Sequence, residues 1–355
     1  MKTEFNSVTL SNDLKKKIKG KVLFDEFSRG RYSTDASLYQ IKPIGVVLPK
    51  DQFDVLNIIE YSQKNSIPLL ARGGGSSQCG QTVGECIVLD YSKYQNKILE
   101  FNAKEKFVWV EPGIVLDQLN EYLKPHGLWF PVDVSTSSRA TIGGMTGNNS
   151  CGSRSLYYGN MVNNVLAVES ILDDGSIHTF ENIDKNYLSK TNDQNRKFQI
   201  IKKCIDIREQ VENEINEHWP KTQRRVGGYN IDLINPNGFN SSNILVGSEG
   251  TLSLFNKIKL KLSEIPKKKI LGVCYFEKFH EAMTLTREMV KLKPTTVELM
   301  DKNLLDLAKE IPIYADGIKK YVIGDPKAVL MVEFIDNDLN PVSYTHLRAH
   351  ETSLH

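Results

Sequence analysis

The chain has 355 residues, of which 40% are hydrophobic and 25% charged, and its net charge of +2 is close to balance. This composition is typical of a soluble globular protein with two or three domains, and it argues against a nucleic-acid-binding surface spread over the whole protein. The sequence holds no run of about 18 apolar residues, so we expect no integral membrane segment.

The N-terminus lacks the apolar core of a secretion signal. The five cysteines are odd in number and include no CxxC pair, which argues against a disulfide framework or a zinc ribbon and favours a cytoplasmic location. We interpret the basic runs Lys15–Lys17 and Lys267–Lys269 as solvated surface. Contact of these lysines with anionic lipid or a polyphosphate is the alternative. Peripheral association with the inner membrane stays open as a separate expectation.

The first part of the chain predicts a polar extension followed by alternating strands and helices. Residues 1–39 are polar and mixed, with a short helix expected near Asp13–Ile18. Gly45–Pro49 is typical of a buried strand, and Asp51 then caps a helix. Further strands are expected at Pro68–Leu70, Ile87–Asp90, Ile98–Phe101 and Phe107–Glu111, and a helix containing Leu116, Leu119 and Leu123 ends at Pro125 and Gly127.

The middle of the chain predicts a long polar loop and a hairpin. Residues 131–159 are rich in Ser, Thr, Gly and Asn and are expected to form a loop. Val165–Leu172 is a strong strand, and the turn Asp173–Ser176 leads into Ile177–Phe180. Residues 181–225 are charged and expected to be helical. Beyond them, Ile258, Leu260 and Leu262 alternate with lysines, as in a strand with one wet face.

A boundary is expected at Pro266, where three lysines follow the proline. Residues 266–340 then predict a second α+β module, a partial substrate or cap domain. Its expected elements are strands at Ile270–Phe276, Thr296–Met300 and Ala328–Ile335 and helices near Glu281–Leu292 and Leu304–Lys309.

The last residues, 341–355, carry three of the seven histidines. His346 and His350 have the i, i+4 spacing of a helical metal pair, and His355 ends the chain. The segment has no apolar periodicity, so we interpret it as a non-native tail and expect no metal site in the protein.

Three successive glycines follow the strand that ends at Arg72. Gly73–Gly75, with Ser76 and Ser77 after them, can expose backbone N–H groups and hydroxyls to phosphate oxygens. A tight surface turn is the alternative. The Rossmann pattern fails because Gln78 stands where its third glycine belongs, and neither a Walker motif nor a serine-hydrolase elbow is present.

A second stretch, residues 135–152, is rich in residues with hydroxyl or amide groups and in glycines, and it has few bulky side chains. A hydrophobic core cannot use such a segment, whereas a polar ligand with several acceptors can. Two such loops suit a long dinucleotide that is held at several points.

The two loops and the motifs around them resemble the flavin-binding domain of the vanillyl-alcohol-oxidase type, also called the PCMH-type FAD domain. The resemblance covers roughly residues 40–265, and within that group it is nearest to the D-lactate, glycolate and D-2-hydroxyglutarate dehydrogenases, especially long bacterial members with an iron–sulfur domain. The motifs that carry it are, in order, Val47–Pro49, Arg72–Ser76, Glu111–Gly113, Ala140–Met145, Tyr158–Gly159, Asp174–Gly175, Gly228–Asn230 and Val246–Leu252.

The resemblance implies an α+β fold, in which a two-subdomain PCMH-type FAD-binding domain precedes an α+β cap that is truncated. It implies that Gly73–Ser77 hold the FAD pyrophosphate, that Val168 offers backbone to the adenine, and that Glu249 and Gly250 lie near the flavin. The other residues expected to bind the cofactor are Arg72, Asp133, Ser137, Thr141, Gly143, Gly144, Asn148 and Asn149.

Some members of the family attach the flavin through a histidine in the first loop. Ser76 occupies that place here, and a serine cannot form the histidyl bond. We therefore expect non-covalent FAD. An iron–sulfur cluster is expected only in sequence that this chain lacks.

The implied reaction is oxidation of a small 2-hydroxy acid by hydride transfer to flavin N5, which also needs a base for the hydroxyl proton and a cation for the carboxylate. The resemblance places these groups beyond residue 340, so the catalytic residues stay unknown. Arg224, Tyr229 and Asn230 are weaker candidates for the substrate side, with a solvated helix end as the alternative for Arg224.

Two other functions stay open. One is a flavin-dependent oxidase for a sugar or alcohol, and the other is an FAD-binding fragment without turnover of its own. The electron acceptor is not indicated by the sequence.

Overall fold

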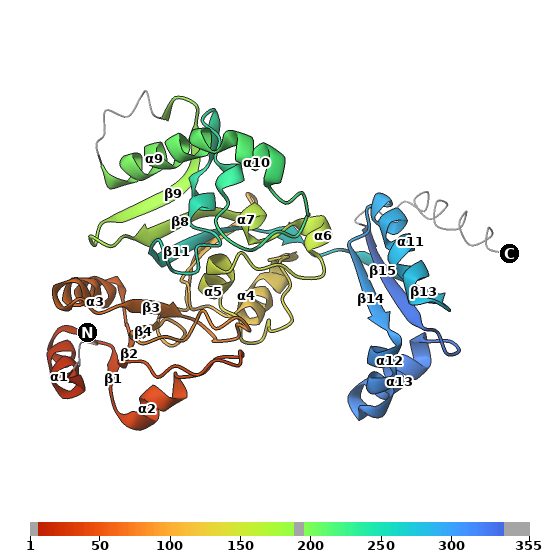
Figure 1. The fold of residues 1–355 in the computed structure, drawn as a ribbon, viewed down its shortest axis with the longest axis horizontal. Helices are drawn as coiled ribbons and strands as arrows, with labels where there is room; N and C mark the ends of the chain where they lie inside the picture. Colours follow the sequence, from red (N-terminus) through yellow and green to blue (C-terminus); the bar gives the residue numbers. More distant parts are fainter. Residues whose placement is uncertain (1–5, 188–194, 337–355) are drawn as a thin grey trace. The chain divides into compact units, whose positions relative to one another are not determined.

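The computed structural model describes residues 6–187 and 195–336. Its residue contacts separate two units (Figure 1). Unit 1 comprises the residues up to 152 together with 158–263, and unit 2 comprises 153–157 and the residues from 264 onward. Each unit has its own hydrophobic core, and unit 1 contains two subdomains.

The first subdomain of unit 1 is built on a four-stranded sheet. The strand order is β1-β2-β4-β3, with β2, β4 and β3 parallel and β1 antiparallel at the edge. β2 and β4 are buried along their whole length, as expected for apolar runs in a parallel sheet. The strands are β1 (Lys21–Leu23), β2 (Gly45–Leu48), β3 (Leu69–Arg72) and β4 (Ile87–Asp90).

Helices α1 (Ser7–Lys17), α2 (Glu26–Arg31) and α3 (Gln52–Asn65) belong to this subdomain (Figure 1). The Asp51 carboxylate caps α3 by accepting from the N–H groups of Phe53 and Asp54, at 2.9 and 3.1 Å, as the sequence predicts. The predicted N-terminal extension is thus more than a short helix, because α1 packs into the same core as α3 and β1 extends the sheet.

The second subdomain is a six-stranded antiparallel sheet with the order β10-β9-β8-β11-β6-β5. β11 lies between β8 and β6, although it is the last of these strands in the sequence. The large core beside the sheet includes Phe130, Phe180 and residues of α4 (Leu116–Leu123) and α9 (Arg196–Gln210). The strands are β5 (Ile98–Asn102), β6 (Phe107–Val110), β8 (Val165–Ile171), β9 (Ile177–Asp184), β10 (Gly238–Asn240) and β11 (Leu254–Lys261).

The structure differs from the predictions in two segments of unit 1. Part of the expected polar loop is helical, because Thr141 caps α5 (Ile142–Gly147) and the apolar side chains of that turn are buried. The expected helical region from residue 181 begins instead as strand, since β9 runs to Asp184 and pairs with β10. The remaining short elements are η1 (Lys124–His126), β7 (Leu128–Trp129), α6 (Ser155–Tyr158), α7 (Met161–Asn164), α10 (Glu212–His218), η2 (Ile231–Leu233), η3 (Ser241–Ile244) and β12 (Ser263–Glu264).

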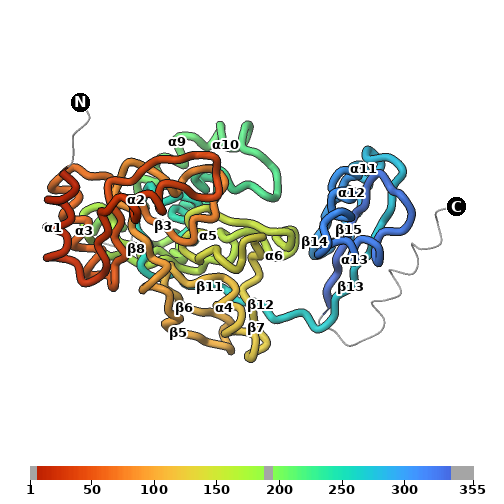
Figure 2. The backbone as a smooth tube through the Cα atoms, turned by 90° about the horizontal axis from the view of Figure 1, so that it is seen from below, coloured from red at the N-terminus to blue at the C-terminus, as the bar shows by residue number. Residues whose placement is uncertain are grey.

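Among its described residues, unit 2 has an antiparallel sheet in the order β13-β15-β14 and the helices α11, α12 and α13 (Figure 2). α11 packs its buried Ala282 against Leu330 and Val332 of β15. The predicted elements are present, and α13 is an addition to them. The elements are β13 (Lys268–Phe276), α11 (Phe279–Lys291), β14 (Thr296–Asp301), α12 (Lys302–Glu310), α13 (Pro312–Tyr321) and β15 (Ala328–Asp336). The predictions for 341–355, with His346, His350 and His355, lie outside the described residues.

Candidate functional site

A cavity of about 430 Å³ lies within unit 1. Most of its wall comes from three segments that are far apart in the sequence, namely residues 71–82, 134–151 and 249–255, and Tyr91, Pro112 and Val226 complete it. The first segment follows β3, the second contains α5, and the third leads into β11. The volume is in the range of ordinary ligand sites, and the polar, small side chains of its walls match the two loops that the sequence singles out.

The glycine loop fits against the second loop because it has no side chains in the way. A Cβ on Gly73 would lie 1.9 Å from Oγ1 of Thr141, and a Cβ on Gly74 would lie 2.2 Å from the carbonyl oxygen of Arg139. Gly75 has a φ of +63°, in the left-handed region that other residues rarely adopt. The glycines therefore allow the two loops to pack closely, and they also leave backbone N–H groups exposed.

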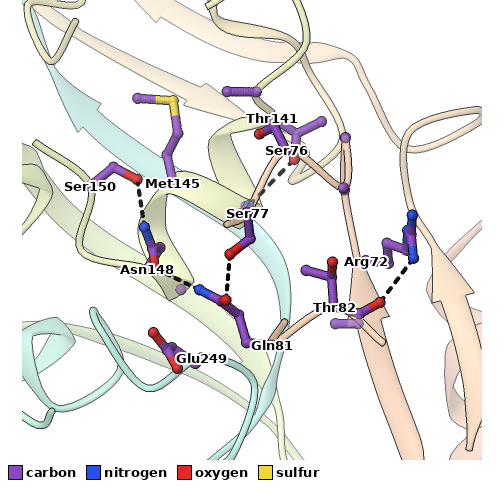
Figure 3. A pocket seen from close by; sticks show the side chains of 18 of the residues that line it. Arg72, Ser76, Ser77, Gln81, Thr82, Thr141, Met145, Asn148, Ser150 and Glu249 are labelled. Atoms are coloured by element: carbon purple, nitrogen blue, oxygen red, sulfur yellow. Dashed lines mark hydrogen bonds between the residues drawn. The ribbon is translucent and has the colours of Figure 1, made fainter. Parts of the chain in front are cut away.

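Hydrogen bonds join the loops around the rim of the cavity (Figure 3). The Ser77 hydroxyl donates to Oε1 of Gln81, and Nε2 of Gln81 donates to Oδ1 of Asn148 at 2.9 Å. The hydroxyls of Thr136 and Ser76 are 3.4 Å apart. A single amide, that of Gln81, thus connects the segment after the glycines to the end of α5.

Two buried hydroxyls in the cavity wall belong to Tyr91 and Ser253. Within the part of the chain that the structure describes, neither hydroxyl has a hydrogen-bond partner. Buried polar groups are nearly always paired in native proteins, so these two hydroxyls are exceptions in the cavity wall.

Among the described residues of the wall, the charged side chains are those of Arg72 and Glu249. Glu249 is exposed and has a φ of +50°, and its N–H donates to the carbonyl of Gly147 at 2.9 Å. This bond holds the third wall segment onto α5.

Arg72 is half-buried and its guanidinium is bonded to backbone carbonyls. Nη1 donates to the oxygens of Thr82 at 2.9 Å and Tyr32 at 3.2 Å, and Nη2 donates to Thr34 at 2.7 Å. Burial lowers the pKa of Arg72, although the charges of Asp35 and Asp90 act against this shift. In Figure 3 its side chain reaches toward Thr82.

The structure gathers most of the predicted cofactor residues at the cavity. Those that line it are Arg72, Gly73, Gly74, Gly75, Ser76, Ser77, Thr141, Gly143, Gly144, Asn148, Glu249 and Gly250.

Four predicted residues, Asp133, Ser137, Asn149 and Val168, are not among the lining residues. Asn149 is fully buried and accepts from the N–H of Val162 at 3.0 Å. Val168 is buried in β8, where it lies opposite Phe180 and Ile258.

The candidate substrate residues also lie outside the set that lines the cavity. Arg224 donates to the carbonyl of Gly152, and the hydroxyls of Tyr229 and Thr251 are 2.8 Å apart. Asn230 is 3% exposed and donates to the carbonyl of Val246 at 2.7 Å. Its amide is therefore used inside the protein.

The wall also contains residues that no sequence pattern predicted, namely Gln81, Thr82, Tyr91 and Ser253. Gln81 and Thr82 had a weak signal, because they continue the polar segment that follows the three glycines. Tyr91 and Ser253 had none, because each lies beside a strand in an unremarkable sequence and enters the wall only through the fold.

Comparison with protein families finds the two parts of the chain in order. The model of the FAD binding domain matches residues 43–181, and the model of the C-terminal domain of FAD linked oxidases matches residues 265–341. The chain thus contains an FAD binding domain followed by a C-terminal domain of the FAD linked oxidase type. The resemblance stated from the motifs is thereby confirmed, and so is the α+β class.

The chain is similar to D-2-hydroxyglutarate dehydrogenases. It is 34% identical over 325 residues to that of Haemophilus influenzae and 34% identical over 317 residues to that of Escherichia coli, in each case across 86% of this chain and 31% of the relative. It is 26% identical over 324 residues to glycolate oxidase subunit GlcD of Bacillus subtilis, across 89% of this chain and 57% of the relative. The chain thus spans about a third of the length of the first two.

A solved structure of alkyldihydroxyacetonephosphate synthase has the same fold. Its TM-score is 0.69 at 17% sequence identity, over 99% of this chain and 60% of that one. At this identity the likeness shows the fold alone.

The residues that line the cavity suit a flavin dinucleotide. The cavity offers a cradle that a Cβ at Gly73 or Gly74 would fill, and two buried hydroxyls that lack partners among the described residues. Across residues 6–187 and 195–336, no cluster of three or more potential metal-ligating side chains and no helix able to cross a membrane is found.

Proposed function

We propose that this chain is the flavin-binding part of an FAD-dependent oxidoreductase that oxidises a small 2-hydroxy acid. The observation that carries the proposal is the cavity of unit 1, which combines the glycine cradle, the amide bridge of Gln81 and two buried hydroxyls in the fold of a PCMH-type FAD oxidase. The names of the similar proteins support the substrate class, and D-2-hydroxyglutarate is the first acid to test.

The residues of the cavity have distinct parts in this proposal. FAD, when bound, supplies the acceptor for the hydride of the substrate carbon. Backbone N–H groups at Gly73–Ser77 bind phosphate oxygens, and Thr141 keeps the second loop against them. Tyr91 and Ser253 donate hydrogen bonds to the cofactor, since buried hydroxyls without partners are otherwise costly.

Asp133, Ser137, Asn149 and Val168 support the site in this proposal without touching the cavity. Asn149 and Asn230 are bonded to each other at 3.5 Å and hold the second loop to the segment before the third wall. Arg224 and Tyr229 stay candidates for the substrate side.

The FAD is proposed to be bound without a covalent link, because Ser76 stands in the first loop. We also infer a cytoplasmic location. The electron acceptor is left to experiment, as is attachment to the inner membrane.

The test is an absorbance spectrum of the purified chain after incubation with FAD and removal of the free cofactor. We expect flavin bands near about 370 and 450 nm, the signature of an oxidised flavin, and we expect acid precipitation to release all of the flavin. A colourless chain that does not bind added FAD would refute the proposal. Flavin that stays with the precipitated protein would refute non-covalent binding.

D-2-hydroxyglutarate, D-lactate and glycolate are then added without oxygen. Bleaching of the 450 nm band by one acid identifies the substrate. A stable flavin spectrum with all three acids would show that this chain binds FAD without turnover of its own.

A further inference from the structure

The side chain of Arg72 is already engaged within the protein. A guanidinium has five N–H donors in a rigid planar fork. Here both hydrogens of Nη1 and one of Nη2 serve the carbonyls of Thr82, Tyr32 and Thr34. The guanidinium also lies 5.3 Å from the centroid of the Tyr32 ring. Because three of the five N–H donors are used in these contacts, few are left for a ligand.

The three carbonyls belong to two segments on either side of the arginine. Tyr32 and Thr34 are in the N-terminal segment, defined here as residues 32–40, and Thr82 follows the glycine loop. The same two segments meet twice more. The Thr82 hydroxyl donates to Oδ2 of Asp35 at 2.8 Å, and Cδ2 of Tyr39 lies 2.4 Å from the place of a Cβ on Gly80.

The contacts continue from Thr82 into the cavity. Its neighbour Gln81 bonds Ser77 on one side and Asn148 on the other, and both of these residues line the cavity. A shift of Thr82 would therefore move the amide that joins the two loops. The N-terminal segment, which does not line the cavity itself, acts on it through Arg72 and Thr82.

We propose that Arg72 is a positioning residue, which fixes the glycine loop and Gln81 by clamping the N-terminal segment to Thr82, and that it does not neutralise the cofactor phosphates. The phosphates are then held by backbone N–H groups and hydroxyls. This inference rests on the proposed function for its link to FAD, but the clamp itself is a property of the chain without cofactor.

The variant Arg72→Lys separates the two roles. It keeps the positive charge that a phosphate contact needs, but it lacks the fork that reaches three carbonyls. Asp35→Asn is the second variant, because Asp35 holds Thr82 and is not a lining residue. Arg31→Lys, at the exposed end of α2, is the matched control.

The first readout is the dissociation constant of FAD at several salt concentrations, measured by flavin fluorescence. We expect R72K and D35N each to weaken binding by about tenfold, as for one lost charge-assisted hydrogen bond. The salt dependence should stay that of the parent, because no phosphate contact is removed. The control should bind like the parent.

The second readout is hydrogen exchange in the cofactor-free chain. We expect R72K to speed exchange in residues 32–40 and 77–82 and to leave β8 unchanged. The inference is overturned if R72K binds FAD like the parent, or if it weakens binding with a smaller salt dependence and unchanged exchange. Failure of the parent to bind FAD would refute the proposed function, whereas the exchange result would still decide whether the clamp exists.

Discussion

At the scale of single residues, the cavity depends on glycines, because their lack of a side chain lets two loops approach closely. Gly73 and Gly74 bring the first loop within van der Waals distance of residues 139–141, so that neither position has room for a methyl group. The neighbour at Gly74 is a backbone carbonyl, which cannot rotate away. A change at this position must move one of the two loops.

Gly74→Ala is expected to separate the loops and to abolish FAD binding at micromolar concentration. Overpacking of this kind costs about 1–3 kcal/mol of stability. Gly30→Ala is the matched control, because a Cβ on Gly30 meets nothing within 4 Å. The measurements are FAD titration and urea unfolding. Equal FAD affinity in G74A and the parent would show that the loops are not packed as described.

The carboxylate of Asp35 makes the N-terminal segment sensitive to acid. Partial burial acts to raise the pKa of Asp35, but hydrogen bonds from Ser37 and Thr82 and the charge of Arg72 outweigh it and lower the pKa. A lowered folded-state pKa gives stability that is present above the unfolded value of about 3.9 and is lost as the pH falls through the folded value.

We therefore expect the difference in urea midpoint between the parent and Asp35→Asn to be constant from pH 7 to about 5 and to shrink below about pH 4. Unfolding curves across this range measure it. A difference that persists at pH 3 would mean that the charge of Asp35 does not contribute.

The cavity could be predicted from the sequence only where its residues form a local pattern. The composition of the three glycines and of the Thr141–Asn148 stretch predicts a polar ligand, and both segments line the cavity. Arg72 lines it too, but its guanidinium serves carbonyls of residues 32 and 34, which no local pattern connects to it. Tyr91 and Ser253 enter the wall through strand pairing, which the sequence near them does not encode.

At the scale of elements, one buried carboxylate joins the N-terminal residues to α3. Asp54 is 1% exposed and accepts from the N–H groups of Lys19, Gly20 and Lys50 at 2.8, 2.9 and 2.8 Å. Its position in the first turn of α3 also suits a negative charge. The chain between α1 and β1 is held in place by these bonds.

Asp54→Asn should lower the free energy of unfolding by about 1–3 kcal/mol, because an amide nitrogen replaces one acceptor and leaves a buried N–H unpaired. Asp206→Asn, an exposed change in α9, is the control and should be neutral. Urea unfolding of both variants tests this. An equal, small effect of the two changes would contradict the role given to Asp54.

The elements that the sequence predicted well are those with continuous burial or a clear cap. β4 was located from its apolar run, and α3 from Asp51 and its periodic face. β1 was missed because Lys21–Leu23 is too short and polar for a pattern, and it is strand only because β2 lies beside it. The end of β9 was also missed, because it is strand only through its pairing with β10.

At the scale of the whole molecule, the cavity belongs to one unit. All residues that line it fall within residues 71–151 and 226–255, which are parts of unit 1. Unit 2 has a separate core on its own sheet. Binding of the cofactor and the structure of unit 2 should therefore be separable.

A chain that stops at Ser263 is expected to bind FAD with an affinity within about threefold of the full chain, because it keeps the hydrophobic cores of unit 1 and each lining segment. Flavin fluorescence titration of the two chains measures this. A loss of tenfold or more would show that residues from 264 onward contribute to the site.

The place of β11 has a consequence for the order in which the protein is made. Synthesis runs from the N-terminus, and domains fold as units while the chain emerges at about 5–20 residues per second. Until Leu254–Lys261 has left the ribosome, β8 and β6 have no strand between them, and the wall segment that leads into β11 is not yet anchored by a paired strand. The glycine loop is complete long before its opposite wall exists. We therefore expect flavin capture to be a late event in the life of the nascent chain, after β11 has been inserted between β8 and β6.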